Sequence, residues 1–276
     1  MLLKGITAVA AVLAVLSGLS AELTAVPLVG LIVLHFLIYW VALLVAAFIF
    51  LVVVSYAVDP EKEQEEDSPF YRGVIALYVE ALISLVGLRV HTKGLENTPK
   101  EGRFLLVCNH QFAADPGVLL HYFKKSQLAF ISKKENVKLF CVGRLMHKIL
   151  CQPMDREDDR QALRVILRCI RIIKEDKASI AVFPEGATNS DDMLHPFRPG
   201  AFKIAQKAEV PIVVCTLQNI RPLFHNLVRL KKTDVELHLV GVIPAEELKG
   251  KTTVEIANRV HKMMADDLGP DLIAES

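Results

Sequence analysis

The chain has 276 residues, of which 52% are apolar and 23% charged, and its net charge is +1 at pH 7. This length suits one domain of ordinary size plus an accessory segment, and the high apolar content excludes intrinsic disorder. The even balance of 32 basic and 31 acidic residues argues against a general nucleic-acid binder, which needs a large cationic surplus.

The N-terminal fifth of the chain is apolar and almost free of charge. Residues 5–21 form one apolar run and residues 26–58 a longer one. Within residues 1–58, Lys4 and Glu22 are the only charged side chains of the types Asp, Glu, Lys and Arg. A membrane-spanning helix needs about 20 apolar residues, so residues 1–58 are predicted to be a membrane anchor of two apolar helices. The alternatives are a signal-peptide core in the first run and a buried helical hairpin inside a soluble fold.

The charges beside the anchor predict its orientation. Lys4 precedes the first run, whereas the connection around Glu22 contains no basic residue. Because basic residues favour the cytoplasmic side, the N-terminus is expected in the cytoplasm, and two spans return the chain to that side. The sequence therefore predicts a cell-membrane protein, multi-pass or hairpin-anchored, whose following domain is cytoplasmic. Whether residues 5–21 fully cross the membrane stays open.

A charged segment separates the anchor from the rest of the chain. Residues 59–69 are expected to be a solvated acidic linker, because residues 59–67 read DPEKEQEED. Residues 70–87 are apolar apart from Arg72 and Glu80. They are expected to form an amphipathic helix that lies against either the folded domain or the membrane surface.

The remaining residues alternate short apolar runs with amphipathic stretches, which is typical of α/β proteins. Residues 70–276 are therefore expected to form an α/β domain, in which helices cover a mixed sheet. The predicted strands are Leu88–His91, Phe104–Cys108, Leu128–Ile131, Ser179–Phe183, Ile212–Thr216 and Val235–Val242. The predicted helices are Gly117–Lys124, Lys138–Leu150, Asp158–Asp176, Ala201–Lys207 and Thr253–Asp267.

The helix predicted over residues 158–176 has two faces. Its apolar residues recur at helical spacing and are expected in the core: Leu163, Ile166, Leu167, Ile170 and Ile173. Its basic residues recur on another face: Arg160, Arg164, Arg168 and Arg171. This basic face is either simply solvated or a contact for anionic lipid headgroups or an acidic carrier.

The exit of one predicted strand carries residues suited to acid–base chemistry. The strand ends at Cys108, and His110 follows in the loop that opens the next helix, where α/β folds place reactive groups. Asp115 precedes Pro116, so it is either the N-cap of that helix or a carboxylate that fixes the tautomer of His110. In the second case the other ring nitrogen of His110 is a base for an alcohol proton, and no metal is required.

A second strand exit lies within residues 182–190, which read VFPEGATNS. Its proline ends the strand and Gly186 permits a tight turn, so Glu185 by itself reads as an exposed turn residue. The segment HPFRPGAF follows over residues 195–202 and contains Arg198.

These motifs resemble the glycerophospholipid acyltransferase superfamily, and most closely its 1-acyl-sn-glycerol-3-phosphate acyltransferases. The resemblance covers about residues 89–217, with the motifs in matching order. The stronger motifs are the H-x₄-D spacing of His110 and Asp115, the FPEG of residues 183–186 and the PFRPGAF of residues 196–202. The weaker ones are Gly94–Pro99, Met154–Arg156 and Val210–Val213, which match a G-x-E-N-x-P lead-in, an Ile-Asp-Arg block and a Val-Pro-Val-Val block.

The resemblance implies a reaction. A fatty acyl group would pass from acyl-CoA or acyl carrier protein, as co-substrate, to the sn-2 hydroxyl of 1-acyl-sn-glycerol-3-phosphate, giving phosphatidic acid for phospholipid biosynthesis. His110 would be the general base and Asp115 its orienting partner, with direct attack of the alcohol on the thioester. Cys108 is expected to be a strand residue and not a nucleophile. The resemblance implies no cofactor, metal or nucleic acid.

The resemblance also implies a set of substrate-binding residues. The phosphate of the acceptor needs cationic donors, and Arg156 is the first candidate, with Lys133 and Arg198 as further ones. Glu185 and Gly186 are expected to shape the acceptor site. The five cysteines are scattered without CxxC spacing, so reduced thiols are expected, with no disulfide framework and no zinc site.

One position departs from the family pattern and keeps alternatives open. The family motif usually continues as Thr-Arg, whose guanidinium contacts phosphate, but Ala187 and Thr188 stand here, and Thr188 supplies only a hydroxyl. The acceptor could then be a different lysophospholipid. Other classes are a non-catalytic membrane lipid-binding protein and a metal hydrolase that recruits His121 or His195 as further ligands.

Overall fold

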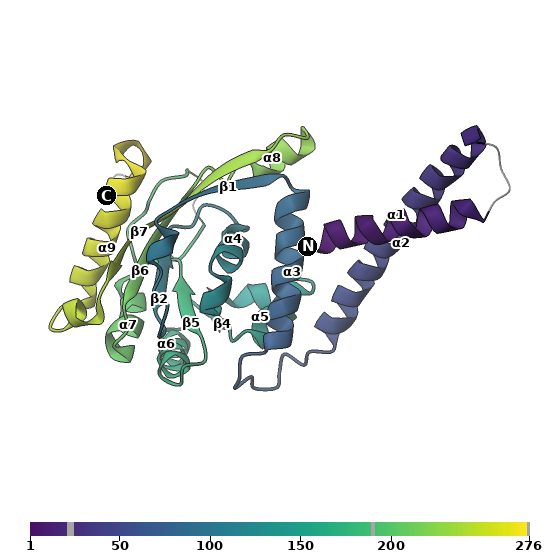
Figure 1. Ribbon diagram of the computed structural model, residues 1–276. Coiled ribbons are helices and arrows are strands. Elements are labelled where there is room, and N and C mark those ends of the chain that lie inside the picture. The colour runs from purple at the N-terminus through teal and green to yellow at the C-terminus, as the bar shows by residue number, and fades with distance from the viewer. Residues whose placement is uncertain (21–24, 189–190, 275–276) are drawn as a thin grey trace.

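In the computed structural model, an α/β domain carries a helical hairpin that projects from one side (Figure 1). The model describes residues 1–20, 25–188 and 191–274. The hairpin consists of α1 (Leu2–Leu19) and α2 (Ala25–Tyr56). The connection around Glu22, on which the predicted orientation depends, and the end of the VFPEGATNS segment lie outside the described residues.

The hairpin exposes most of its apolar side chains. Both helices are long and apolar enough to cross a membrane, and none of the most apolar part of α2 is buried. The two helices pack on each other where Gly18 meets Ile32 and where the hydroxyls of Ser17 and Tyr39 lie 2.7 Å apart. A hairpin in the core of a soluble fold would be buried, so that alternative is wrong.

The described residues of the α/β domain form a seven-stranded sheet in the order β1-β7-β6-β2-β5-β3-β4. From β6 to β4 the strands run parallel, whereas β7 and β1 run in the opposite direction. The mixed sheet expected from the sequence is confirmed. The strands are β1 (Leu88–Lys93), β2 (Leu105–Cys108), β3 (Leu128–Lys133), β4 (Gln152–Met154), β5 (Ser179–Val182), β6 (Ile212–Gln218) and β7 (Thr233–Ile243).

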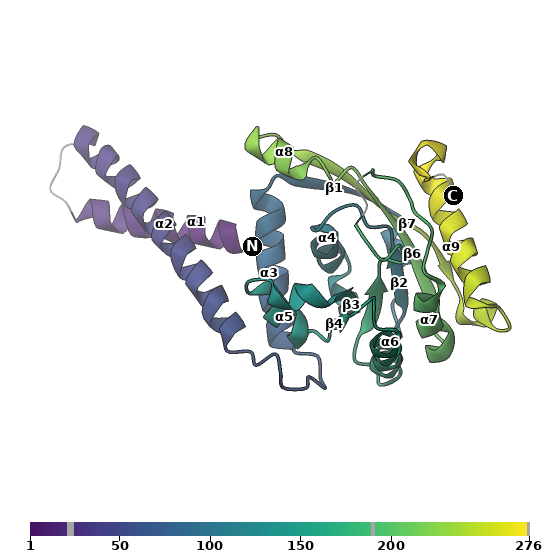
Figure 2. The ribbon, with the colours of Figure 1, turned by 180° about the vertical axis from the view of Figure 1, so that it is seen from behind.

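Helices cover both faces of the sheet (Figures 1 and 2). The central strands β2 and β5 are buried along their whole length and read as continuous apolar runs, as strands covered on both faces do. The helices on one face are α6 (Asp159–Lys174), α7 (Lys203–Ala208) and α9 (Thr253–Leu268). Those on the other face are α3 (Pro69–Leu85), α4 (Asp115–Tyr122), α5 (Val142–Lys148) and α8 (Leu223–Val228).

Some elements differ from the sequence-based expectations. The helix expected over Lys138–Leu150 is shorter, because Cys141 has a φ of 56° and separates α5 from the 3₁₀ turn η3 (Lys134–Lys138). Neither β4 nor α8 was expected. β4 contains Pro153 and lies at the edge of the sheet, where proline is tolerated, and α8 has only six residues.

Helix α6 buries a different stripe from the expected one. Ile166 and Ile173 are buried as expected, and Ile170 packs partly against the core, but Leu163 and Leu167 are exposed. The inner face is formed instead by Val165, Ile166, Cys169, Ile172 and Ile173. The expectation for the two leucines is therefore wrong, and they lie among the arginines on the outer face.

The acidic linker is attached to α6 and not simply solvated. Arg168 donates to a carboxylate oxygen of Glu65 at 3.2 Å and to the carbonyl of Gln64 at 2.9 Å. Lys177, just beyond the helix, pairs with Glu66 at 3.0 Å. One of the four arginines of the basic face thus binds the linker and is not open to solvent.

Helix α3 lies against the α/β domain. Arg72 pairs with Asp67 at 2.6 Å and donates to the carbonyls of Gln127 and Leu128 at the start of β3. Other side chains of α3 point away from the domain and are exposed, namely Phe70, Leu82 and Leu85. The amphipathic helix expected from the sequence is therefore packed on one side and open on the other.

Candidate active site

Most of the predicted site residues lie at one edge of the sheet. β2, β5, β3 and β4 run parallel, so their carboxyl ends meet at the same edge, which is where open α/β sheets bind ligands. His110 follows β2, Glu185 follows β5, Lys133 ends β3 and Arg156 follows β4. Four segments that are distant in sequence thus contribute to one surface.

His110 and Asp115 form a hydrogen-bonded pair at the end of β2. The Nδ1 atom of His110 lies 2.8 Å from Oδ2 of Asp115, whose side chain is completely buried. The same oxygen accepts hydrogen bonds from the backbone N–H groups of Gln111 and Phe112, at 2.7 and 2.9 Å. A carboxylate acceptor assigns the proton to Nδ1 and leaves Nε2 with a free lone pair. The arrangement can therefore act as an oriented base.

Asp115 is not the N-cap of α4. The helix begins at Asp115 itself, and Ala114 occupies the cap position, where no side chain caps the helix. An N-cap oxygen would accept from N–H groups two or three residues later, whereas Asp115 accepts from residues that precede it. The capping interpretation is therefore wrong, and the carboxylate serves the loop that carries His110.

Two side chains from the β5 exit hold His110 in place. The ring of Phe183 stacks on the imidazole, with 4.1 Å between centroids and 19° between planes. Glu185 accepts from the backbone N–H of His110 at 2.8 Å and from that of His195 at 3.2 Å. Glu185 is buried, so its interpretation as an exposed turn residue is wrong. It ties the two loops on either side of the site together.

Asn109 is a positioning residue that the sequence analysis missed. Its side-chain amide donates to the carbonyl of Leu217 at 2.8 Å and accepts from the N–H of Leu217 at 2.7 Å. These bonds fasten the end of β2 to the end of β6, one residue before His110. A buried asparagine directly after a fully apolar strand is the signal that could have revealed it.

Two arginines flank the site without a hydrogen-bonded or ion-paired anion among the described residues, although the charge of Glu135 acts on Arg156. Gly186 has a φ of 78°, and a Cβ there would lie 2.6 Å from Nε of Arg198, so the guanidinium lies directly over the glycine. Partial burial, and next the positive charge of Arg198, lower the pKa of Arg156. Within the described part of the chain, neither guanidinium forms a hydrogen bond or an ion pair. Two close, unpaired cations make a site for an anion.

Lys133 lies beside Arg156 but is less available. It pairs in register with Met154, two residues before Arg156. Its Nζ is 3.6 Å from a carboxylate oxygen of Glu135, so its charge is partly neutralised. Ala187 and Thr188, at the positions of the family's Thr-Arg, are both exposed.

The cysteine beside the His110 and Asp115 pair is expected to be unreactive. Cys108 is fully buried, and burial raises the pKa of its thiol well above the usual value, as do the nearby Cys215, Asp115 and Glu185. A thiol without access to its thiolate form is a poor nucleophile. All five cysteines are free and buried.

The histidines proposed as further metal ligands have other surroundings. The Nε2 atom of His195 lies 2.9 Å from an oxygen of Asp191, and the ring of His121 packs on Tyr122. Across residues 1–20, 25–188 and 191–274, no group of three or more His, Cys, Asp or Glu side chains could hold a metal ion.

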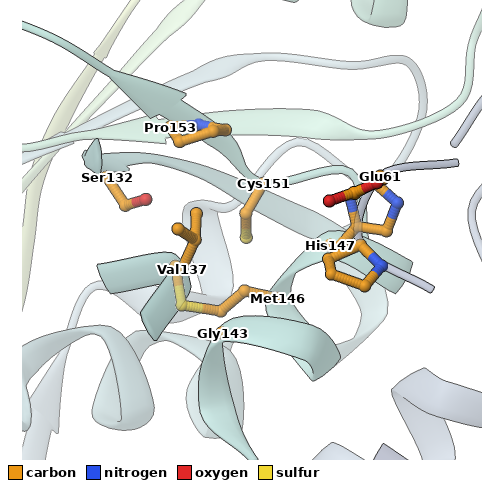
Figure 3. A pocket seen from close by; sticks show the side chains of 9 residues that line it. Glu61, Ser132, Val137, Gly143, Met146, His147, Cys151 and Pro153 are labelled. Carbon is orange, nitrogen blue, oxygen red and sulfur yellow. The ribbon is translucent and has the colours of Figure 1, made fainter. Parts of the chain in front are cut away.

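A cavity of about 260 Å³ lies between β3, β4, α5 and the start of the acidic linker (Figure 3). Glu61 and His147 lie close together at one side of it. It is lined by Pro60, Glu61, Ser132, Val137, Gly143, Met146, His147, Cys151 and Pro153. Neither His110 and Asp115 nor the two arginines line it, so the chemistry of the pair does not depend on this cavity.

Comparisons with known proteins point to one family. The family model described as Acyltransferase matches residues 89–218. A 1-acyl-sn-glycerol-3-phosphate acyltransferase of Haemophilus influenzae is 31% identical over 187 residues, covering 67% of this chain and 75% of that protein. A chloroplastic 1-acyl-sn-glycerol-3-phosphate acyltransferase of Brassica napus is 36% identical over 126 residues, covering 45% of this chain and 36% of that protein.

The fold is also found among solved structures. The crystal structure of the 1-acyl-sn-glycerophosphate acyltransferase PlsC from Thermotoga maritima matches with a TM-score of 0.60 at 22% identity, covering 79% of this chain and 86% of that one. For four curated relatives, the Brassica protein among them, the chain spans only 36% to 60% of their length. The range matched by the family model contains the His110 and Asp115 pair.

Proposed function

The chain belongs to the acyltransferase family of the 1-acyl-sn-glycerol-3-phosphate acyltransferases, and from this premise we propose its reaction. It transfers a fatty acyl group from a thioester to the sn-2 hydroxyl of 1-acyl-sn-glycerol-3-phosphate, giving phosphatidic acid. The observation that carries the proposal is the 2.8 Å contact between His110 and Asp115 at a strand exit.

The proposed chemistry is general-base catalysis by His110. Its Nε2 takes the proton of the sn-2 hydroxyl while the hydroxyl oxygen attacks the thioester carbonyl. The C–S bond then breaks, and the thiolate of CoA or of the carrier protein leaves and takes the proton from Nε2. Asp115 keeps the tautomer fixed and stabilises the imidazolium between these steps. General-base help of this kind contributes roughly 10²–10⁴ in rate.

Arg156 and Arg198 are proposed to bind the phosphate of the acceptor. Their charges repel each other, and a phosphate dianion between them offsets that repulsion and gains charge-assisted hydrogen bonds. Lys133 is a third, more exposed cation at the same edge. This assignment offers a replacement for the guanidinium that the family carries where Thr188 stands.

A second acceptor class is favoured by Thr188. A phosphodiester lysophospholipid carries one negative charge fewer than a phosphate monoester, so it needs one cation fewer. With Thr188 exposed at the site, the second proposal is an acyltransferase for such an acceptor.

The hairpin is proposed to anchor the chain in the cell membrane, with the α/β domain on the cytoplasmic side. The proposal is supported by the length, composition and exposure of α1 and α2. An anchored domain meets its lipid acceptor in two dimensions, which raises the effective concentration. The acyl donor, whether acyl-CoA or acyl carrier protein, then arrives from the cytoplasm.

The decisive experiment is an acceptor-by-donor activity matrix with the purified full-length chain. We expect thioester-dependent acylation, with the glycerophosphate lysolipid as the best acceptor. If it is the poorest acceptor offered, the named substrate is wrong. If no donor acylates any acceptor, the enzyme proposal fails.

The role of His110 is tested in the same assay. His110→Ala should lower turnover by about 10²–10⁴, while the circular dichroism spectrum and vesicle association stay unchanged. His91→Ala is the matched control, because His91 is exposed on β1 and pairs with Asp234 away from the site. Turnover of His110→Ala close to that of the wild type would contradict the assignment.

A further inference from the structure

An exposed apolar tip stands at one corner of the α/β domain. It is formed by Phe224 and Val228 of α8 and by Leu230 just beyond the helix, which are 64%, 86% and 94% exposed. Leu223, in contrast, is buried and anchors α8 to the core. Isolated exposed apolar side chains are ordinary, but three of this size on one short segment indicate an interaction site.

The backbone conformation at Leu230 also indicates that the apolar tip has a function. Leu230 has a φ of 54° and its N–H donates to the carbonyl of Leu227, in the turn that ends α8. Glycine or asparagine is the usual residue at such a left-handed position. A leucine is strained there, and in water it also exposes its whole side chain. An apolar surrounding for the leucine would account for its presence.

The apolar tip continues onto α3. Gly87, which follows α3, lies within ordinary contact distance of Lys232, and its carbonyl accepts from the N–H of Thr233 at 3.0 Å. The end of α3, where Leu82 and Leu85 are exposed, is thus joined through Gly87 to the segment that follows α8. Both views show α3 and α8 on the side of the domain from which the hairpin projects (Figures 1 and 2).

Cations surround the apolar tip. Residues 221–232 read RPLFHNLVRLKK and contain no acidic side chain. Arg229, Lys231 and Lys232 are exposed, and in the described residues none of their side chains forms a hydrogen bond or ion pair. Apolar side chains surrounded by unpaired cations match a bilayer with anionic headgroups.

The apolar tip is connected to the catalytic loop. The ring of Phe224 packs edge-on against that of Phe112, with 5.3 Å between centroids. The backbone N–H of Phe112 in turn donates to Asp115. A surface that binds the apolar tip therefore lies next to the loop that carries His110.

We propose that the apolar tip, with the exposed end of α3, is a second membrane-contact surface beside the hairpin. Phe224, Val228 and Leu230 insert at the boundary between headgroups and acyl chains, while Arg229, Lys231 and Lys232 bind the headgroups of anionic phospholipids. The contact turns the sheet edge with His110 toward the bilayer, so the acceptor enters from the lipid phase. This last purpose rests on the proposed function, but the contact itself does not.

The contact is tested on the full-length chain in vesicles of phosphatidylcholine and phosphatidylglycerol. An environment-sensitive fluorophore is attached at Leu230→Cys, with Leu167→Cys as the matched control, since Leu167 is a 56% exposed leucine on α6. The native cysteines are buried, and the labelled wild type gives their background. We expect blue-shifted emission and quenching by nitroxide lipids at position 230 only. Equal spectra at both positions, or quenching at 230 by an aqueous quencher alone, would overturn the proposal.

A second measurement tests the role of the cations and the apolar side chains. Lys231→Glu/Lys232→Glu and Val228→Ser/Leu230→Ser should each lower acylation of a bilayer acceptor by at least about fivefold. Activity on a monomeric short-chain acceptor should stay unchanged. Equal activity of the variants and the wild type on both substrates would contradict a membrane contact. So would a dimer in detergent that dissociates in the Leu230→Ser variant. An enzyme inactive on every acceptor would refute the proposed function and leave the fluorescence result standing.

Discussion

At the scale of single residues, one carboxylate oxygen of Asp115 receives three hydrogen bonds, from the ring of His110 and from the N–H groups of Gln111 and Phe112. The other oxygen is buried and has no partner among the described residues. The carboxylate therefore shapes the loop and fixes the imidazole at once. A change at Asp115 disturbs the imidazole of His110 and the backbone of its loop together.

Asp115→Asn should lower turnover by about 10²–10⁴, because an amide can present its N–H₂ group to donors and no longer fixes the tautomer of His110. Asp158→Asn is the control: Asp158 is the true N-cap of α6 and accepts from the N–H of Gln161, and asparagine caps almost as well as aspartate. Steady-state kinetics and thermal unfolding of both variants check this. A mild effect at Asp115 would mean that it does not orient His110.

Gly186→Ala should weaken acceptor binding, because its Cβ would meet Nε of Arg198 at 2.6 Å and displace the guanidinium. Loss of a charge-assisted bond predicts a KM for the acceptor about ten- to a hundredfold higher, with a smaller change in kcat. Gly250→Ala is the control for backbone strain, since Gly250 has a φ of 72° and open space around it. If both variants change KM equally, Arg198 does not bind the acceptor.

At the scale of elements, the acidic linker and α6 form a unit held by charge. Glu65 and Glu66 are mostly exposed, and they meet Arg168 and Lys177, whose side chains are largely covered. Exposed ion pairs contribute little individually, but several together restrict a short segment. The linker thus fixes where α2 ends relative to the α/β domain.

Arg168→Ala should make the linker more sensitive to a glutamate-specific protease, because the variant loses its bonds to Glu65 and to the Gln64 carbonyl. Arg164→Ala is the control, since Arg164 is an exposed arginine of the same helix that binds no other described side chain or backbone group. Cleavage rates in low and high salt check this, because salt screens the pairs. Equal rates for both variants would contradict the restraint.

The same restraint depends on pH. The hydrogen bond from Arg168, followed by one with Glu63, lowers the pKa of Glu65 from its ordinary 4.5. Because the folded pKa is the lower one, the pairing is complete above pH 4.5 and is lost as the pH falls through the lowered value. Linker protection should therefore be constant at neutral pH and fall only in clearly acidic buffer.

The sequence predicted those parts of the site that are local in the chain. His110 and Asp115 are five residues apart. The short loop between the end of a strand and the start of the next helix is enough to bring them together. The roles of Asn109 and Glu185 could not be predicted, because their partners Leu217 and His110 depend on which strands are neighbours. The misplaced Leu163 and Leu167 show that helical spacing does not choose between two apolar stripes.

At the scale of the whole molecule, the hairpin, α3 and the apolar tip share one side of the α/β domain (Figure 1). The sequence indicated the hairpin, since a long charge-free run is a strong signal. It did not indicate the apolar tip, because α8 is short and its exposure depends on how β6 and β7 are joined. A bilayer on this side would contact all three.

The proposed orientation puts both ends of the chain in the cytoplasm. An impermeant thiol reagent should therefore fail to label Asp271→Cys in intact cells and should label it after permeabilisation. Residue 271 lies beyond α9 and is exposed, so access to the reagent depends on the membrane alone. Labelling in intact cells would contradict the predicted topology.

The burial of Cys108 has a consequence for the proposed thioester chemistry. Any accessible thiolate near a bound acyl donor would exchange with it and trap the acyl chain on the protein. Cys108 lies two residues from His110, yet its thiol has no access to solvent, and burial also raises the pKa of Cys151 to about 11. If the proposed donor binds there, the buried thiol should not be acylated, and thiol-directed reagents should leave turnover unchanged.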